Sequence, residues 1–517
     1  MGARDAHAHS LLYYSPMLVL VAIALADTVR VSDPDLWGHI TFGRAVLAQG
    51  HLVLRDPYSY SAPGSPWLNH EWLTEVIQAF LFDAFGVFGL NLWKLFLTAV
   101  TIVFVALAEG ETEAPYLAQI AVLLVGAVTI APEMQFRPQM FTFALFAIVL
   151  FLLARDTYRR DGAVWIAIPM LALWANLHGG FIMGVAALGI YTVASGVVNC
   201  VRSRTFRRAG VLAAITVAAS AATLLTPYGV GTWIAVAHAL LNPYTRVAVA
   251  DWQPFFRSLV AASHEGFLRT LYEAMPLGLM AALAIAVAVS RDFEDLPMLA
   301  IATVMCVAAI VAIRNIPIAV IAMAAPLARH GAIAAARLNP TSRSETMPEV
   351  RGASLMNQIV LGIAALAMLI GTGFFSRRMT ARERYPAGAV AFMQSHGLHG
   401  NILDNFLWGE YLIWHLSPRS KVFIDGRYDT VYPQNILLAF MLFHFDQPGA
   451  DAILARWPHD YVMLPPGDLA NNVIARHREW KLIYRDGDTL LYARAGSAAA
   501  AMPGVPFVGV NPPTRFP

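Results

Sequence analysis

Charged residues are scarce in this chain of 517 residues. Asp, Glu, Lys and Arg together make up 14% of the sequence, whereas apolar types make up 57%, a balance far from that of soluble domains. The formal net charge is only +2 and the basic residues form no single patch, so no nucleic-acid partner is expected. The apolar excess indicates a protein whose surface faces lipid.

Cysteine and several functional motifs are equally scarce. The two cysteines, Cys200 and Cys306, lie in separate apolar segments, which excludes a disulfide framework and a thiolate metal site. The sequence has no Walker loop, which argues against an ATP-driven pump. No small-residue cleavage site follows the apolar run at 11–29, so we expect this run to be a retained first helix.

Long apolar runs are what the chain does contain. Between residues 11 and 375 they recur with lengths that suit a hydrocarbon core of about 30 Å. We therefore predict an α-helical polytopic membrane protein of about eleven transmembrane helices. These are expected near 11–29, 88–108, 115–131, 140–154, 163–177, 181–200, 210–226, 272–290, 296–313, 315–329 and 354–375. Another apolar helix, near 72–86, is expected to lie at the membrane interface or to extend the second span.

Arginines in the short loops predict the orientation of these spans. The loops at 155–160, 201–208 and 329–343 are rich in arginine and are therefore assigned to the cytoplasmic side. An odd number of spans then places the chain beyond residue 376 outside the cytoplasm. We expect a multi-pass protein of the bacterial inner membrane, part of the cell envelope, with a periplasmic C-terminal region.

The expected domains follow from these runs. Residues 1–375 form a transmembrane domain with a long first external loop at 30–74. Residues 376–495 form a small soluble α/β domain, and residues 496–517, rich in Ala, Gly and Pro, form a disordered tail. Within the α/β domain, apolar periodicity predicts helices and strands in alternation. The helices are expected at Ala387–Gln394 and Asn435–Phe443, and the strands at Asn401–Leu403, Lys421–Ile424, Asp460–Leu464 and Trp480–Tyr484.

The first external loop carries an unusual set of polar side chains. Asp33 and Asp35 flank Pro34 directly after the first span, so both carboxylates can project from one tight turn. Asp35 and His39 are four residues apart and share a face if a helix begins at Pro34. A plainer interpretation is that Asp33 only caps that helix. Capping leaves the rest of the set unexplained, namely Asp35, His39, Arg44, His70 and Glu71.

The other external turns also contain polar side chains, which spanning helices usually avoid because such groups are costly at membrane depth. Each has a plain alternative. Arg137 can pair with Glu133 as a structural bridge. His178 can bond backbone carbonyls in a turn, and Arg314 can extend to the interface. All of them fall on the same side as the first loop, and together they predict a charged cavity that opens outward. Its expected lining is Glu133, Arg137, Asn176, His178, Asp251 and Arg314.

Carboxylates and arginines beside a bilayer suit group transfer from a lipid phosphate donor. Arginine provides a fixed charge for a phosphate leaving group, and one carboxylate can accept the proton of an incoming hydroxyl. A divalent metal held by the carboxylates stays open, although no tight spacing of ligands requires one.

Several segments carry a family resemblance. The segment Asp33-Pro-Asp-x-Trp-x-His39 resembles the integral-membrane glycosyltransferases of the GT-C fold, which include protein O-mannosyltransferases, aminoarabinose transferases and oligosaccharyltransferase catalytic subunits. The segment Asn69–Trp72 stands where mannosyltransferase-like members carry a Pro-Pro-Leu motif, which is absent here. Further segments similar to a bacterial branch of that superfamily are Arg137–Phe141, Trp174–Phe181, Thr226–Gly229 and Phe423–Arg427.

The resemblance implies a polyprenyl-phosphate-linked sugar as donor, an inverting transfer and a first-loop aspartate as base. By position that base is Asp33 or Asp35, and Glu133 matches a second acidic residue that relatives carry between the third and fourth spans. The Trp-Trp-Asp motif of oligosaccharyltransferases is absent, which disfavours protein N-glycosylation. The acceptor therefore stays open among glycan, lipid and protein.

The α/β domain has its own polar cluster, which includes Asp404, Glu410 and the segment Asp425–Asp429. Asp-Gly after an apolar strand usually marks a turn. The functional alternative is that Arg427 and Asp429 contact an acceptor.

Three functional hypotheses follow. The first is an inverting glycosyltransferase that acts at the periplasmic face. A transporter or flippase of lipid-linked saccharides would also need an outward cavity, but tends to show internal repeats, and no convincing repeat is found. A non-catalytic membrane scaffold is the third. For the first, the candidate catalytic residues are Asp33, Asp35 and Glu133, and the candidate substrate-binding residues are His39, Arg44, His70, Glu71, Arg137, His178, Arg314 and Arg427.

Overall fold

The structure is a computed structural model that describes residues 21–22, 31–202, 207–242, 250–339, 355–371, 379–381, 383–502 and 515–516. The chain divides into two compact units. The helical unit comprises Met1–Val29 and Asn91–Phe375, and the mixed unit comprises Arg30–Leu90 and Ser376–Pro517. These units differ from the expected domains in one respect, because the first external loop belongs with the C-terminal region.

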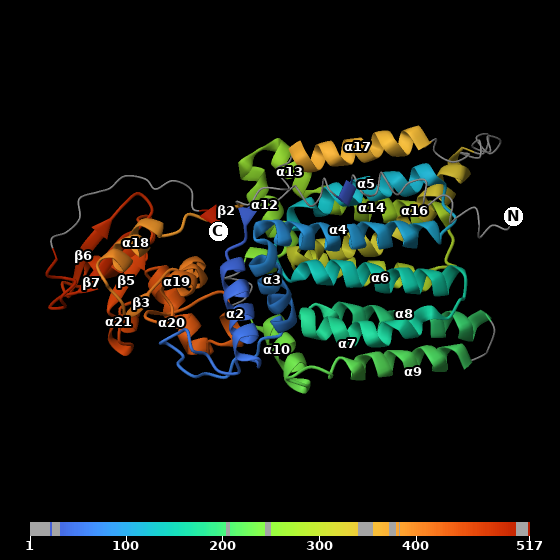
Figure 1. Ribbon diagram of the computed structural model, residues 1–517. Coiled ribbons are helices and arrows are strands. Elements are labelled where there is room, and N and C mark those ends of the chain that lie inside the picture. The colour runs from blue at the N-terminus through green and yellow to red at the C-terminus, as the bar shows by residue number, and fades with distance from the viewer. Residues whose placement is uncertain are drawn as a thin grey trace. The chain divides into compact units, whose positions relative to one another are not determined.

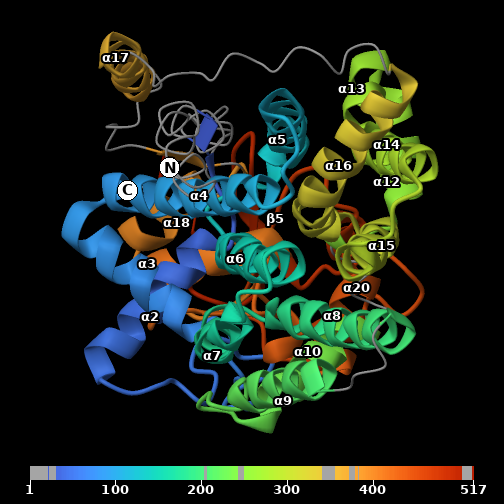
Figure 2. The same ribbon diagram turned by 90° about the vertical axis from the view of Figure 1, so that its right-hand side faces the viewer.

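The helical unit is built from the apolar runs of the sequence. Its helices are α4 (Val87–Gly110), α5 (Tyr116–Ile130), α6 (Gln139–Tyr158), α7 (Ala167–Leu177), α8 (Phe181–Arg202), α9 (Arg207–Ala222), α10 (Val230–Leu241), α12 (Phe255–Glu265), α13 (Phe267–Glu273), α14 (Met275–Ser290), α15 (Leu296–Val311), α16 (Ile316–Leu338) and α17 (Leu355–Gly371). In two perpendicular views α4, α6, α8 and α9 run roughly parallel (Figures 1 and 2). Helix α16 packs against α5, α6, α14 and α15 and so lies at the centre of the unit.

Several of these helices can cross a membrane. Five in the described part of the chain are long and apolar enough, namely Val87–Gly110, Tyr116–Glu133, Gln139–Tyr158, Phe181–Val201 and Ile313–Leu338. A sixth span results if α13 and α14, which meet at a bend of 48°, count as one. The shorter helices α7, α9, α15 and α17 coincide with further expected spans. The expected span at 11–29 lies outside the described residues except for residues 21 and 22. The predicted multi-pass helical architecture is confirmed.

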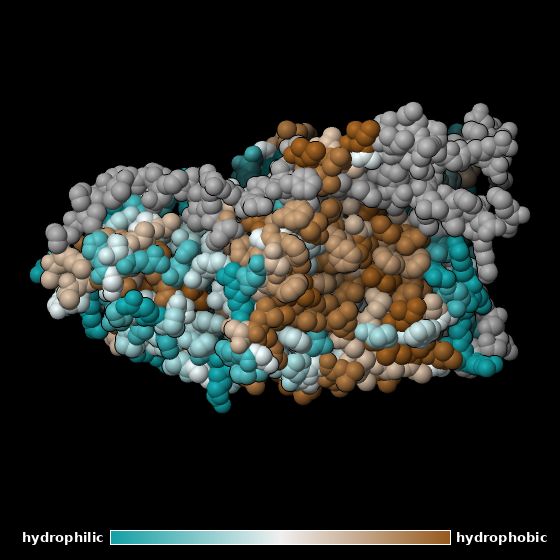
Figure 3. Space-filling view, viewed as in Figure 1, coloured by the Kyte–Doolittle hydropathy of each residue, from teal (hydrophilic) through white to brown (hydrophobic). Residues whose placement is uncertain are grey.

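The outside of the helical unit is mainly apolar. In the face shown in Figure 3, hydrophobic residues dominate over the helical unit, and hydrophilic residues are more frequent over the mixed unit. In the apolar windows of Gln139–Tyr158 and Ile313–Leu338, 72% of the residues are buried, against 22% in Tyr116–Glu133. The first two are therefore interior helices, and the third presents most of its side chains outward.

The C-terminal part of the mixed unit is the expected α/β fold. A five-stranded sheet has the order β4 (Lys421–Val422), β3 (Asn401–Leu403), β5 (Tyr461–Leu464), β7 (Leu490–Arg494) and β6 (Trp480–Arg485). Strand β3 is parallel to β4 and β5, whereas β7 is antiparallel to β5 and β6. The accompanying helices are α18 (Ala387–Ser395), α19 (Gly409–Leu416), α20 (Gln434–His444), α21 (Ala452–Arg456) and α22 (Ala470–Ala475). The predicted helices and strands are confirmed with small shifts, and the additions are β7, α19, α21 and α22.

The first external loop packs against this α/β fold and pairs with its strands. Its helices α2 (Leu36–Gln49) and α3 (Trp72–Phe85) pack against each other, and α2 also packs against α19. Strand β1 (Val31–Ser32) pairs in parallel with β2 (Met379–Ala381). The backbone N–H of Tyr60 donates to Val422 O at 3.1 Å, and Val422 N–H donates to Tyr58 O at 3.2 Å. The loop therefore extends the edge of the five-stranded sheet beside β4.

An aromatic core closes over α2. Trp37 is fully buried, and its ring lies 4.4 Å from Phe516 and 5.0 Å from Tyr411, centroid to centroid. Phe516 belongs to β8 (Arg515–Phe516), which pairs with β2. The tail at 496–517 was expected to be disordered. Strand β8 differs from that expectation, because the side chain of Phe516 is buried against Trp37. Residues 503–514 lie outside the described part of the chain.

Candidate functional site

The two candidate bases lie in a turn of the mixed unit between β1 and α2. Asp33 is only 2% exposed, and its Oδ1 accepts a hydrogen bond of 3.1 Å from the backbone N–H of Asp35. Helix α2 begins at Leu36, later than expected from Pro34, and Asp35 occupies the N-cap position. The side chain of Asp35 makes no capping hydrogen bond. Asp33 therefore accepts the N–H two residues on, as the plain capping interpretation expects, whereas the side chain of Asp35 makes no capping bond.

A third carboxyl group reaches α2 from the C-terminal region. Glu410, at the start of α19, is 4% exposed, and its Oε2 accepts a hydrogen bond of 3.0 Å from the backbone N–H of Gly38. A Cβ built on Gly426 would lie 2.7 Å from Oε1 of Glu410 and 2.8 Å from Oδ1 of Asp35. Both carboxyl groups therefore face the same point of the backbone. Burial raises the pKa of Glu410 well above its usual value, and the charge of Asp35 adds to this.

A buried histidine provides positive charge beside these carboxylates. Nδ1 of His39 lies 3.4 Å from Oε1 of Glu75 on α3. Burial alone lowers the pKa of His39, but the hydrogen bond with Glu75 and the charges of Glu71, Glu75 and Asp35 raise it to about 9. His39 therefore holds its proton near neutral pH and offsets part of the negative charge.

The segment before α3 completes this arrangement. The backbone N–H of Glu71 donates to Oδ1 of Asn69 at 3.1 Å, and Nδ2 of Asn69 donates to Oε2 of Glu75 at 2.5 Å. Nε2 of His70 lies 3.7 Å from Oε1 of Glu71. We call the resulting group the acidic cluster, which consists of Asp33, Asp35, His39, Glu71, Glu75 and Glu410.

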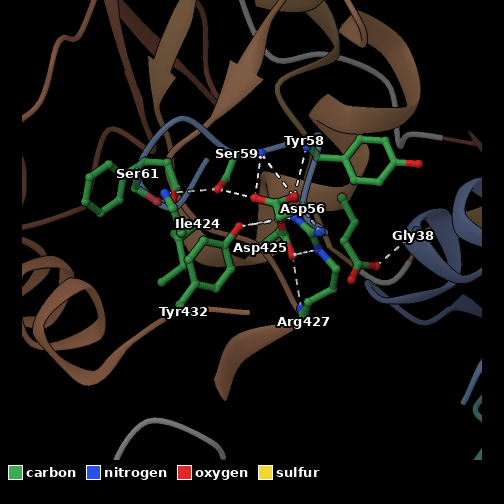
Figure 4. Close-up of polar contacts among 12 residues, drawn as sticks. Gly38, Asp56, Tyr58, Ser59, Ser61, Ile424, Asp425, Arg427 and Tyr432 are labelled. Atoms are coloured by element: carbon green, nitrogen blue, oxygen red, sulfur yellow. Dashed lines mark hydrogen bonds and ion pairs between the residues drawn. The ribbon is translucent and has the colours of Figure 1, made fainter. Parts of the chain in front are cut away.

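Arg427 lies in a neighbouring buried network of the mixed unit. Its Nε and Nη2 donate to Oδ1 and Oδ2 of Asp425 at 2.8 and 2.6 Å, and its Nη1 donates to Oδ1 of Asp56 at 2.7 Å (Figure 4). Oδ1 of Asp56 also accepts the backbone N–H of Tyr58 at 2.9 Å, and Tyr432 Oη donates to Oδ2 of Asp425 at 2.6 Å. The guanidinium ties the first loop to the turn after β4. This geometry favours a structural role for Arg427 over the expected contact with an acceptor.

Arg44 has a surface position. Its Nε donates to Oδ1 of Asp83 at 2.9 Å, and both side chains are about half exposed, at 40% and 44%. Its guanidinium also lies 4.6 Å from the ring centroid of Trp414. Arg44 therefore links α2 to α3 and α19 on the outside of the unit.

Two predicted arginines of the helical unit converge on one short segment. Nη1 of Arg137 lies 2.5 Å from Oδ2 of Asp251, in the 3₁₀ turn η3 (Ala250–Trp252). Arg314, in η4 (Ile313–Asn315), places its guanidinium 4.4 Å from the ring centroid of Trp252. We call Arg137 and Arg314 the arginine pair. Arg137 has Asp251 as an ionic partner, where the sequence suggested Glu133.

The remaining predicted residues of the helical unit have local roles in the structure. Nδ1 of His178 lies 2.7 Å from Oγ1 of Thr142 and accepts the backbone N–H of Gly180 at 3.0 Å. His178 therefore bonds a backbone N–H and a hydroxyl group in its turn, where the sequence suggested backbone carbonyls. Glu133 ends the 3₁₀ turn η1 (Ala131–Glu133).

One charged side chain of the helical unit was overlooked in the sequence. Lys94 in α4 is 1% exposed, and its Nζ lies 4.6 Å from the ring centroid of Phe136, in the loop that carries Arg137. A lysine inside a long apolar run is costly in a membrane and is itself a signal for function.

A divalent metal was left open by the sequence. Among the residues that the structure describes, no group of three or more His, Cys, Asp or Glu side chains is arranged to hold a metal ion. The acidic cluster is instead balanced by His39 and by backbone N–H donors.

Comparisons with known proteins identify the fold. No protein-family model and no curated protein matches the chain. The oligosaccharyltransferase of Archaeoglobus fulgidus is similar with a TM-score of 0.56 and 12% identity, over 94% of this chain and 75% of the transferase. ArnT from Cupriavidus metallidurans, bound to undecaprenyl phosphate, has a TM-score of 0.50 and 13% identity, over 95% and 99% of the two chains. The arabinofuranosyltransferase AftD from Mycobacteria has a TM-score of 0.51 and 14% identity, over 93% of this chain and 40% of AftD. The expected GT-C fold is confirmed.

Proposed function

We propose that this chain, which shares the GT-C fold, is an inverting glycosyltransferase that moves a sugar from a polyprenyl-phosphate donor to an acceptor hydroxyl. The proposal places the reaction at the periplasmic face of the bacterial inner membrane. Two of its structural neighbours are described as an oligosaccharyltransferase and an arabinofuranosyltransferase, and a third was solved with undecaprenyl phosphate. The observation that carries the proposal is the acidic cluster, because Asp33 and Asp35 stand directly after the first expected span and the fold brings the buried Glu75 and Glu410 close to them.

The acidic cluster suits base catalysis. In the proposed reaction the acceptor oxygen attacks the anomeric carbon of the donor sugar while the bond from that carbon to the phosphate oxygen breaks. The bonding electrons leave with polyprenyl phosphate, and the carboxylate of Asp33 or Asp35 takes the proton of the acceptor hydroxyl. Attack from the side opposite the leaving group inverts the anomeric configuration. His39, held protonated, keeps the local negative charge from accumulating.

The helical unit offers groups for the donor lipid. A departing phosphate gains from fixed positive charge, which the arginine pair and Lys94 can supply. A small apolar pocket between α4, α5, α14 and α16 can contact part of a polyprenyl chain, which has no polar group along its length. Its lining includes Ile102, Leu123, Gly126, Leu279, Val320 and Leu327. Glu133 and His178 stay candidates, to be tested by substitution.

Transfer and transport make different predictions in a reconstituted system. Purified protein in proteoliposomes is given undecaprenyl-phosphate-linked hexoses or pentoses and an extract of envelope glycans and lipids as acceptors. A glycosyltransferase releases undecaprenyl phosphate in step with the appearance of glycosylated product. A flippase moves the intact donor across the bilayer without cleaving it. If neither cleavage nor movement exceeds protein-free liposomes across the donor panel, the scaffold hypothesis replaces both.

A further inference from the structure

The side chain of Glu410 caps the N-terminus of helix α2 in place of the N-cap residue. The side chain at an N-cap position normally accepts a backbone N–H two or three residues into the helix. Asp35 occupies that position but makes no such bond, and the N–H of Gly38, three residues on, donates to Glu410 at 3.0 Å. The capping oxygen thus comes from a residue 372 positions away in the sequence.

Close packing fixes the carboxyl group of Glu410 in this place. A Cβ on Gly38 would lie 2.2 Å from Cδ of Glu410, so α2 and the carboxyl group touch without room for a methyl group. A Cβ on Gly409, the residue before Glu410, would lie 2.2 Å from the carbonyl oxygen of Ile424. The start of α19 therefore packs tightly against the turn that leads to Gly426, and the carboxyl groups of Glu410 and Asp35 both lie next to Gly426.

The charges around Glu410 come from three elements. Asp35 faces it from the start of α2, Asp425 and Arg427 from the turn after β4, and Glu75 from α3, with His39 beside Glu75. Burial is the largest influence and raises the pKa of Glu410, and Asp35 and Asp425 raise it further. Burial and two neighbouring negative charges therefore favour the protonated, neutral form of Glu410.

We propose that Glu410 is a positioning residue for Asp35, which it serves by capping α2 and by standing beside Asp35 as a neutral acid. The inference rests on the proposed function for its catalytic meaning, since it makes the C-terminal region part of the apparatus that presents the base. A neutral Glu410 does not repel the carboxylate of Asp35. Its hydrogen bond to helix α2 holds the turn that carries Asp33 and Asp35 in place.

The carboxyl pair can be tested without any sugar transfer. Infrared spectra of the full-length protein and of Glu410→Gln are subtracted at a series of pH values, so that only the carboxyl group of Glu410 remains in the difference. The carbonyl band of a protonated carboxyl group is expected at neutral pH. In an Asp35→Asn background the band should disappear at a lower pH, because a neighbouring negative charge has been removed. The interaction between Glu410 and Asp35 is refuted if no band of a protonated carboxyl group appears at neutral pH. It is also refuted if the pH at which the band disappears is the same with and without Asp35→Asn.

The positioning role is tested by transfer and by thermal unfolding together. Glu410→Gln retains an oxygen for the Gly38 N–H and mimics the neutral acid, so turnover and Tm should stay near wild type. Glu410→Ala removes the cap, and a misplaced base should cost about 100-fold in turnover at saturating donor. Gly426→Ala, whose methyl group would displace both carboxyl groups, should lower turnover likewise. Gly467→Ala is the matched control, because nothing lies within 4 Å of a Cβ there.

The outcomes separate the two proposals. Turnover of Glu410→Gln as low as that of Glu410→Ala would show that an ionised Glu410 is needed and would overturn the role as a neutral positioning residue. Wild-type turnover in Glu410→Ala would overturn positioning altogether. If wild type transfers no sugar, the proposed function fails, while the infrared titration still decides whether Glu410 and Asp35 form a pair.

Discussion

Arg427→Met should destabilise the mixed unit more than any surface substitution. The side chain of Arg427 is 4% exposed, and its guanidinium pairs with two fully buried carboxylates, those of Asp425 and Asp56. Methionine has a similar length but no charge, so both carboxylates would be left in a buried site without a cation. Breaking a buried ion pair in this way typically costs about 3–5 kcal/mol. Aromatic contacts add to this, because the guanidinium lies 4.8 Å from the ring centroid of Trp67.

The expected loss can be measured as a shift in thermal unfolding. For a unit of this size, about 2–4 °C of Tm corresponds to each kcal/mol, so Arg427→Met should lower Tm by on the order of 10 °C. Thermal unfolding of the full-length protein in detergent is followed by tryptophan fluorescence, because Trp67 lies next to Arg427 and reports on this site. Arg476→Met is the matched control, because Arg476 pairs with Asp446 at the surface and its Tm should not change measurably.

A combined variant separates loss of charge balance from loss of volume. Arg427→Met together with Asp56→Asn and Asp425→Asn removes the cation and both anions, so no buried charge remains unpaired. Much of the lost Tm should return in this variant. If Arg427→Met unfolds at the wild-type temperature, the network does not hold the first loop. If the triple variant is as unstable as the single one, packing and not charge is responsible.

Three further predictions concern single contacts. Gly43→Ala should destabilise by about 1–3 kcal/mol, because a Cβ would lie 2.1 Å from a backbone oxygen of α3, and the Tm of Gly467→Ala measured beside it should stay unchanged. His39 has its pKa raised from 6.5 to about 9, so its charge stabilises the fold fully below pH 6.5 and this contribution is lost as the pH rises through 9. Wild type should therefore lose more Tm than His39→Gln between pH 7 and pH 9, and equal losses would show that the histidine is not held charged. Arg137→Gln and Arg314→Gln should each raise the KM for the donor about 10- to 100-fold if the arginine pair binds phosphate, and an unchanged KM would remove them from the donor site.

Local patterns in the sequence were sufficient to predict most of the helices and strands. Hydropathy placed α4, α5, α6, α8 and α16, since a run of apolar residues needs no tertiary partner to be recognised. Period-two and period-3.6 patterns placed the strands and helices of the α/β region to within a few residues. Asp33 and Asp35 stood out because two carboxylates directly after an apolar span are unusual in themselves.

Contacts between residues far apart in the sequence could not be predicted from such local patterns. Asp56 and Arg427 are 371 residues apart, and Glu410 and Gly38 are 372 apart, so no spacing in the sequence indicates either contact. Arg427 was noticed, but an arginine near aspartates suits an anion site and a buried ion pair equally well. Burial distinguishes the two, and burial is a property of the folded chain. Phe516 is a similar case, since its buried ring follows a segment of disorder-like composition.

The most direct test of the central claim compares wild type with Asp33→Asn and Asp35→Asn in the proteoliposome transfer assay. Asp83→Asn, an exposed carboxylate of α3, serves as the control at matched Tm. If a first-loop carboxylate is the base, one of the two variants should lose about 100- to 10,000-fold in turnover, while Asp83→Asn stays at the wild-type rate. Equal turnover in wild type, Asp33→Asn and Asp35→Asn would contradict the proposed mechanism and leave the transport and scaffold hypotheses.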